Sequence, residues 1–195
     1  VTEEGGERDH RDRPFAERWD GREWTVATVP FPAEKTSGRL ADVSCASTTS
    51  CMAVGWSQEG SQNRKAFATR WNGSEWSTAT PAAPAGAQGN VELNGVSCVS
   101  ATSCIAVGTY ISKLEGLNQE SRTLVESWNG SAWSIVPSPS PNGGLKRLLG
   151  VAAVSTDDVW AVGSDDSTAD AFIQHWDGTQ WSLVSDPNIG EYRYL

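Results

Sequence analysis

The residues best suited to chemistry are four cysteines, which form two pairs with the same spacing. Five residues separate Cys45 from Cys51, and five separate Cys98 from Cys104. A third copy of the surrounding pattern lacks both cysteines, as expected if each pair forms one bond. Directly opposite residues of an antiparallel hairpin are close enough for a disulfide, so we predict the disulfides Cys45–Cys51 and Cys98–Cys104. Buried free thiols are the alternative, whereas the spacing does not match a zinc site.

Other candidate catalytic groups are few. The histidines are His10, in a charged leading segment, and His175, beside a tryptophan of the repeat described below. Asp157 and Asp158 share a turn, and acids commonly stabilise such turns themselves. The sequence has no nucleophile elbow, phosphate loop or metalloprotease motif. We therefore assign no catalytic, cofactor-binding or metal-binding residues. This result favours a protein that is not an enzyme, and we expect no cofactor.

An internal repeat of about 50 residues positions these groups. One unit of the repeat has the pattern Trp, then Asp or Asn, then Gly, then two further residues and a second Trp. Its four copies begin at Trp19, Trp71, Trp128 and Trp176. Asn-Gly between strand-like residues is a strong hairpin signal and, as a two-residue turn, would pair Trp71 with Ser74. The second unit carries the cysteines and predicts two more strands, at 40–45 and 51–55 in its first copy.

Four antiparallel strands in about 50 residues match the size of a β-propeller blade. We predict an all-β fold with three complete blades and a partial one. The expected divisions are a polar N-terminal segment at 1–14 and propeller repeats at 15–195, comprising a partial blade at 15–30, blades at about 40–81, 93–137 and 148–187, and a tail at 188–195. A β-sandwich is the structural alternative.

The turns within both units have constant length, whereas the segments that join the units vary. These segments run from 55 to 71, from 108 to 128 and from 163 to 176. In an antiparallel blade they emerge on one face of the disc, and variable loops on a rigid scaffold are common binding sites. Trp56 and Tyr110 follow the second strand where it opens onto this face, so they are possible ligand-facing aromatics, with packing between blades as the alternative.

The tryptophan units and the segment 151–163 resemble repeats of exported bacterial proteins, especially actinobacterial ones, that are described as kelch-like or similar to the galactose oxidase central propeller. The resemblance covers 15–187. It implies a propeller and export, but no activity, because the histidines needed for a copper site like that of galactose oxidase are missing.

The composition of the sequence limits the classes of partner and the cellular location that we expect. The formal net charge is −9, which opposes binding to nucleic acid. No apolar run approaches the roughly 18 residues of a membrane span, and the start of the sequence does not resemble a signal peptide, so an exported form would carry its signal outside this sequence. Disulfides persist outside the cytosol, which favours an extracellular or cell-surface location.

These features favour a non-catalytic exported module that binds a glycan or protein partner, or acts as a scaffold, through the variable face. One alternative is a glycan-active hydrolase or lyase with a site built from loops, and another is a structural component of a larger extracellular assembly. Three blades and a part fall short of a closed ring. We therefore expect completion by further blades or by self-association.

Overall fold

The computed structural model describes residues 13–115, 118–141, 143–168 and 170–184. Within these ranges every helix or strand assigned is a β-strand. No helix among these residues is long and apolar enough to span a membrane. Most of the predicted N-terminal segment 1–14, and all of the tail 188–195, lie outside the described residues.

The strands form one two-stranded sheet and three four-stranded sheets, all antiparallel. The partial blade is β1 (Ala16–Trp19) and β2 (Trp24–Ala27). Blade 1 is β3 (Ser37–Ser47), β4 (Ser50–Gln58), β5 (Lys65–Trp71) and β6 (Trp76–Thr78). Blade 2 is β7 (Val91–Ser100), β8 (Ser103–Glu115), β9 (Asn118–Trp128) and β10 (Trp133–Ile135). Blade 3 is β11 (Lys146–Ala153), β12 (Val159–Asp165), β13 (Asp170–Trp176) and β14 (Trp181–Val184).

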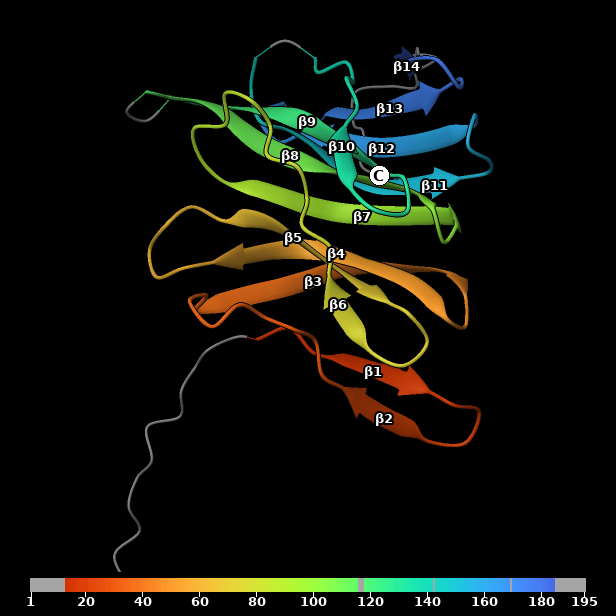
Figure 1. Cartoon of the computed structure of the whole chain (residues 1–195). Helices are drawn as coiled ribbons and strands as arrows, with labels where there is room; N and C mark the ends of the chain where they lie inside the picture. Colours follow the sequence, from red (N-terminus) through yellow and green to blue (C-terminus); the bar gives the residue numbers. More distant parts are fainter. Residues whose placement is uncertain (1–12, 116–117, 142, 169, 185–195) are drawn as a thin grey trace, which may run out of the picture.

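Each blade is a simple meander in which sequential strands are neighbours. The blades follow one another in chain order from the partial blade to blade 3 (Figure 1). This arrangement confirms the predicted fold class, with three complete blades and a partial one.

The cysteine-bearing hairpin is longer than the sequence predicted. In blade 1, β3 and β4 extend past the expected 40–45 and 51–55 at both ends, and the pairing register shifts between Leu40 and Asp42. Gly55 lies opposite this shift. A Cβ atom at Gly55 would meet the backbone oxygen of Arg39 at 1.8 Å, and Gly108 and Gly163 have equivalent clashes. The repeated glycine is therefore required by close approach of two backbones.

The predicted register of the tryptophan hairpin is wrong. Trp71 pairs with Trp76 and not with Ser74, so the loop has four residues. The cause is the Asn72 side chain, whose Oδ1 accepts hydrogen bonds from the backbone N–H groups of Ser74 (2.9 Å) and Glu75 (3.0 Å). Gly73 supplies the required positive φ of 101°. The two indoles still pack together, with ring centroids 5.8 Å apart.

Both predicted disulfides are present. Cys45 pairs with Cys51 and Cys98 with Cys104, each pair with Cα atoms 3.9 Å apart. Each bond joins directly opposite residues of the first two strands of its blade.

The core lies between the blades. One cluster joins Met52, Val54 and Ala68 of blade 1 to a set on blade 2 that includes Val96 and Trp128. A second cluster joins blade 2 to blade 3 in the same way. Because side chains alternate along a strand, each complete blade has two apolar faces, and each face is buried only when another blade covers it.

Serine side chains also join the first strands of neighbouring blades. Ser44 Oγ accepts a hydrogen bond from the backbone N–H of Cys98, and Ser97 Oγ accepts one from Ala153, both at 3.0 Å. The third copy has Ala152 at the serine position, so blade 3 cannot offer this bond to a following blade.

We expect Trp128→Ala to lower the free energy of unfolding by about 3 to 5 kcal/mol, because the indole is 7% exposed within the core between blades. Trp24→Ala is the matched control. Trp24 is the second tryptophan of the equivalent hairpin in the partial blade, where its side chain is 65% exposed. Its loss should cost less than about 1 kcal/mol of stability. Urea unfolding measures both values, and equal losses would contradict the burial pattern.

Glu126 is a carboxylate buried in the core between blades 1 and 2. It is 0% exposed, and its Oε2 accepts a hydrogen bond from the backbone N–H of Ala82 at 2.8 Å. Its Oε1 has no protein partner among the described residues. Burial raises the pKa of Glu126 to about 7, although the bond from Ala82 lowers it in part. In blade 3, Gln174 takes the equivalent position and donates to the backbone oxygen of Pro139 at 2.6 Å.

This raised pKa predicts that the free energy of unfolding falls as pH rises from 4.5 to about 7. The folded protein holds the Glu126 proton more tightly than the unfolded chain does, so stability is lost progressively between the unfolded pKa of 4.5 and the folded pKa of about 7. The full loss is about 3 kcal/mol. Glu126→Gln should remove most of this slope in urea unfolding at several pH values, whereas exposed Glu75→Gln should keep it. An unchanged slope in Glu126→Gln would contradict the assignment.

Candidate functional site

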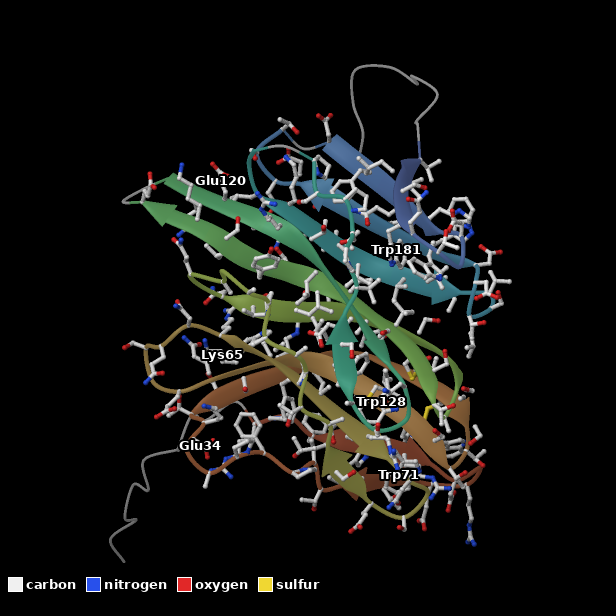
Figure 2. All side chains as sticks on the ribbon, turned by 45° about the horizontal axis from the view of Figure 1, so that its top comes forward. Glu34, Lys65, Trp71, Glu120, Trp128 and Trp181 are labelled. Carbon is white, nitrogen blue, oxygen red and sulfur yellow. A yellow bond between two sulfur atoms is a disulfide. The ribbon has the colours of Figure 1, made fainter. Side chains whose placement is uncertain are left out.

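The two ends of the strands define two different faces. Figure 2 shows Trp71, Trp128 and Trp181 toward one side of the molecule, and Glu34, Lys65 and Glu120 toward the other. The first side carries the tryptophan hairpins and the cysteine-bearing turns. The second side, which we call the loop face, carries the residues 59–64 and 166–168 and the ends of β8 and β9 at Glu115 and Asn118.

Blade 2 extends furthest on the loop face. In blades 1 and 3 the second strand ends at Gln58 and Asp165, but in blade 2 it continues to Glu115 and β9 begins at Asn118. The extra length that the sequence places between 108 and 128 is therefore paired strand. The paired strands β8 and β9 project at the edge of the loop face (Figure 1).

A groove of about 160 Å³ lies on the loop face between blades 2 and 3. Its lining comes from both blades, at the ends of their first strands and along the β8–β9 hairpin. The lining residues are Asn90, Glu92, Thr109, Ile111, Gln119, Ser121, Leu145, Arg147 and Asp166.

The groove carries charges of both signs. Arg147 forms an ion pair with Asp166, and their side chains are 45% and 32% exposed. Glu92 Oε1 accepts a hydrogen bond from Arg64 Nη1 of blade 1 at 2.9 Å. Together with the amides of Asn90 and Gln119, these groups offer donors and acceptors to a polar ligand.

A buried ion pair supports the groove. Lys146 Nζ contacts Asp165 Oδ2, and their side chains are only 3% and 12% exposed. Burial alone would raise the pKa of Asp165, but hydrogen bonds from Lys146 and Ser167 outweigh it and lower the pKa to about 2. The backbone oxygen of Lys146 accepts hydrogen bonds from the hydroxyls of Thr109 and Ser121, both at 2.8 Å. Blade 3 is thereby fixed to the strands that line the groove.

Neither aromatic residue proposed from the sequence lines this groove. Trp56 is half-buried, and the Arg64 guanidinium lies over its ring at 4.1 Å from the centroid. Tyr110 is half-buried and packs against the core between blades 1 and 2. Trp56 shares a face of β4 with Met52 and Val54, which belong to that same core. Both rings therefore lie at the seam between blades 1 and 2, and a role in ligand binding stays a prediction.

His175 and Asp158 lie at the opposite end of the strands from the groove. His175 Nε2 is 2.9 Å from Asp158 Oδ1, and its ring stacks on Trp160 with centroids 4.2 Å apart. Asp158 Oδ1 also accepts a hydrogen bond from Trp160 Nε1 at 2.9 Å. These contacts make a local surface cluster on blade 3. No group of three possible metal ligands is brought together within the described residues.

The charged residues of the loop face were not predicted from the sequence. Glu92 and Arg147 occupy equivalent positions in the first strands of blades 2 and 3, but the residue type at that position changes from blade to blade. Asp166 lies in a joining segment, and the proximity of the three residues depends on how two blades meet. The burial of Glu126 could have been predicted from the sequence. It stands two residues before Trp128, and strand alternation places both side chains on the same apolar face.

No protein-family model matches the chain, and a search of curated proteins finds no match. Among solved structures, the chain is similar to "YCF48 bound to D1 peptide", with a TM-score of 0.50 and 18% sequence identity. The similarity covers 85% of this chain and 45% of that one, so this chain spans less than half the length of its structural neighbour. YCF48 is a β-propeller, and the likeness supports the same fold here.

We expect the Lys146–Asp165 and Arg147–Asp166 ion pairs to make very different contributions to the free energy of unfolding. Asp165→Asn leaves the buried Lys146 ammonium without its counter-charge and should cost about 3 to 5 kcal/mol of stability. Asp166→Asn breaks the more exposed pair with Arg147 and should cost less than about 1 kcal/mol. Thermal or urea unfolding of the two variants measures the difference, and similar costs would argue against a buried pair beneath the groove.

Proposed function

We propose that this chain is a non-catalytic, exported propeller module that binds a protein or glycan partner through its loop face. The observation that carries the proposal is the groove between blades 2 and 3. Part of its lining, including Ile111, Gln119 and Asp166, comes from the joining segments that differ among the repeats, on a scaffold whose opposite face repeats closely. Rigid scaffolds with variable loops commonly bind partners in this way.

The chemistry of the groove suits a polar, extended ligand. Glu92, Arg147 and Asp166 present charges of both signs, while Asn90 and Gln119 present amides that can pair with a peptide backbone or with sugar hydroxyls. The projecting β8–β9 hairpin supplies one wall. We favour a protein partner, because the structural neighbour is a propeller bound to a peptide.

Two further features support export. The disulfides Cys45–Cys51 and Cys98–Cys104 are compatible with an oxidising compartment. The resemblance of the repeats to kelch-like repeats of exported bacterial proteins favours the same location. Within that setting the chain acts as a binding or scaffold module.

The test is a selection for binders with a displayed library of random 12-residue peptides, run beside a glycan array. We expect selected peptides to bind the protein, and Arg147→Ala to weaken that binding at least tenfold, about 1.4 kcal/mol. Arg22→Ala is the matched control. It removes an exposed arginine from a tryptophan hairpin on the other face and should leave binding unchanged.

Three outcomes would overturn the proposal. If neither the peptide library nor the glycan array yields a binder, the proposed binding role is contradicted. Ligands that respond to Arg22→Ala and not to Arg147→Ala would place binding on the other face. Hydrolysis or elimination of an arrayed glycan would favour the alternative of a glycan-active enzyme.

A further inference from the structure

The crossover from blade 1 to blade 2, residues 79–90, connects the core to the groove of the loop face. It runs from the end of β6 to the start of β7. Ala79, at its start, is 5% exposed and belongs to the core between blades 1 and 2. Asn90, at its other end, lines the groove together with Ile111 of β8. A change in the position of this crossover therefore reaches the groove.

The last residues of the crossover are fixed to β8 beside the groove. The backbone N–H of Gln88 donates to the backbone oxygen of Ile111 at 2.8 Å, and the N–H of Ile111 donates to the backbone oxygen of Asn90 at 2.9 Å. Gly89 is buried between them, and a Cβ atom there would meet Cβ of Ile111 at 2.8 Å. The shape of the groove beside Asn90 and Ile111 thus depends on close packing of the crossover against β8.

The middle of the crossover depends on a single hydrogen bond to a blade. Residues 80–87 are all described, and among them only Ala82 is hydrogen-bonded to a blade, through its N–H and Glu126 Oε2 at 2.8 Å. The crossover from blade 2 to blade 3 is held by more bonds, because Thr123 alone forms three with residues 138–140. The position of residues 80–87 is therefore unusually dependent on the side chain of Glu126.

The equivalent contact in blade 3 involves no charge. Gln174 and Pro139 occupy the positions of Glu126 and Ala82, each at the same spacing from a tryptophan of the repeat. Pro139 has no N–H to donate, and the side-chain amide of Gln174 donates to the Pro139 backbone oxygen at 2.6 Å. A neutral amide is therefore sufficient at this position, whereas blade 2 has a carboxyl group there.

The surroundings of Glu126 do not neutralise a carboxylate. The crossover 79–90 contains no charged residue and no histidine. The strands β4, β7 and β10 contribute apolar side chains to this core. Charged and titratable side chains at the same seam are Asp42 of β3, Arg64 and its ion-pair partner Glu92, Arg70 of β5, Tyr110 of β8 and Arg122 of β9. None of them forms a hydrogen bond with Glu126 among the described residues, and Oε1 of Glu126 has no partner there.

Ionisation of Glu126 is therefore costly while the crossover is closed. Burial raises the pKa of Glu126 from 4.5 to about 7, against the opposing effect of the bond from Ala82. A form in which the carboxyl group reaches water loses its proton more readily, so this form is favoured as pH rises from 4.5 to about 7. Movement of the crossover hydrates the carboxylate directly, because Ala82 contacts it and residues 80–87 have no other hydrogen bond to a blade.

We propose that Glu126 is a pH-dependent switch for the groove of the loop face: its protonated form keeps the crossover 79–90 closed, and its ionised form releases it. The inference rests on the proposed function of that groove and describes its regulation. Release moves Asn90 and separates Gln88 from Ile111, so the groove is complete in the closed form. A ligand of the groove therefore favours the closed crossover, because the coupling between two sites is reciprocal.

Hydrogen exchange at single amides of the free 195-residue protein tests the switch without a ligand. We expect the opening constant at Ala82, corrected for intrinsic exchange, to rise about tenfold from about pH 5.5 to about pH 6.5 and to level off above about pH 7. The Gln88 amide should follow it. Glu126→Gln keeps an acceptor for Ala82 and should remove the pH dependence at both amides. Glu75→Gln, which changes an exposed residue, should keep it.

Val107 distinguishes release of the crossover from global unfolding. Its amide belongs to β8, which has a strand on both sides, and its side chain is 0% exposed. At about pH 6.5 the Ala82 amide should have an opening constant at least about 100 times that of Val107, because release of the crossover leaves the blades folded. Thermal unfolding of Glu126→Gln establishes that this variant is folded.

A peptide selected for binding to the groove of the loop face tests the coupling. At about 100 times its Kd, the peptide should lower the opening constant at Ala82 at least about tenfold, since a ligand that binds the closed form suppresses opening. Arg22→Ala protein should respond as the wild type does. A selection that yields no binder contradicts the proposed function, while the exchange measurements on the free protein still decide whether Glu126 controls the crossover.

The inference fails on any of three results. An opening constant at Ala82 that does not change with pH, or that changes equally in Glu126→Gln, excludes Glu126 as the switch. Equal opening constants at Ala82 and Val107 mean that Glu126 responds only to global unfolding. A bound peptide that leaves the opening constant at Ala82 unchanged shows that the crossover and the groove are independent.

Discussion

The structure depends on burial of apolar surface between successive blades. A four-stranded sheet has two faces, and alternate side chains make both faces of each complete blade apolar. Met52 and Val54 are sealed only because blade 2 lies over them, and Val107 and Val125 only because blade 3 does. The disulfides, the close backbone approach at Gly55 and the serine hydrogen bonds all fix the shape of faces that must fit one another.

This constraint separates stability from binding. The strand ends with the tryptophan hairpins repeat closely, since each hairpin packs a pair of indoles in the same register. The opposite ends are joined between blades by polar contacts, such as those of the Lys146 backbone oxygen with the Thr109 and Ser121 hydroxyls, and their length and charge differ from one blade to the next. The loop face is consequently where one blade differs from the next, and where the β8–β9 hairpin and the groove with Arg147 and Asp166 occur.

Much of the fold could be predicted from the sequence, because the repeat shows which residues are equivalent. The strand order, the disulfides and the apolar role of the tryptophans follow from local patterns. The register of the Trp71 hairpin did not follow, because it depends on the Asn72 side chain and not on the Asn-Gly pair alone. The groove of the loop face was also unpredictable in detail. Arg147 and Glu92 meet there only through the packing of two blades, which no local spacing encodes.

Residue-resolved hydrogen exchange tests the dependence on blade packing most directly. The account predicts that amides of β4, β8 and β9, which have a strand on both sides and blades packed against them, exchange slowest. Amides of β1 and β2 should exchange fastest among the strands, because the partial blade has few buried side chains. Equal protection of β1 and β9 in the isolated 195-residue protein would contradict the account.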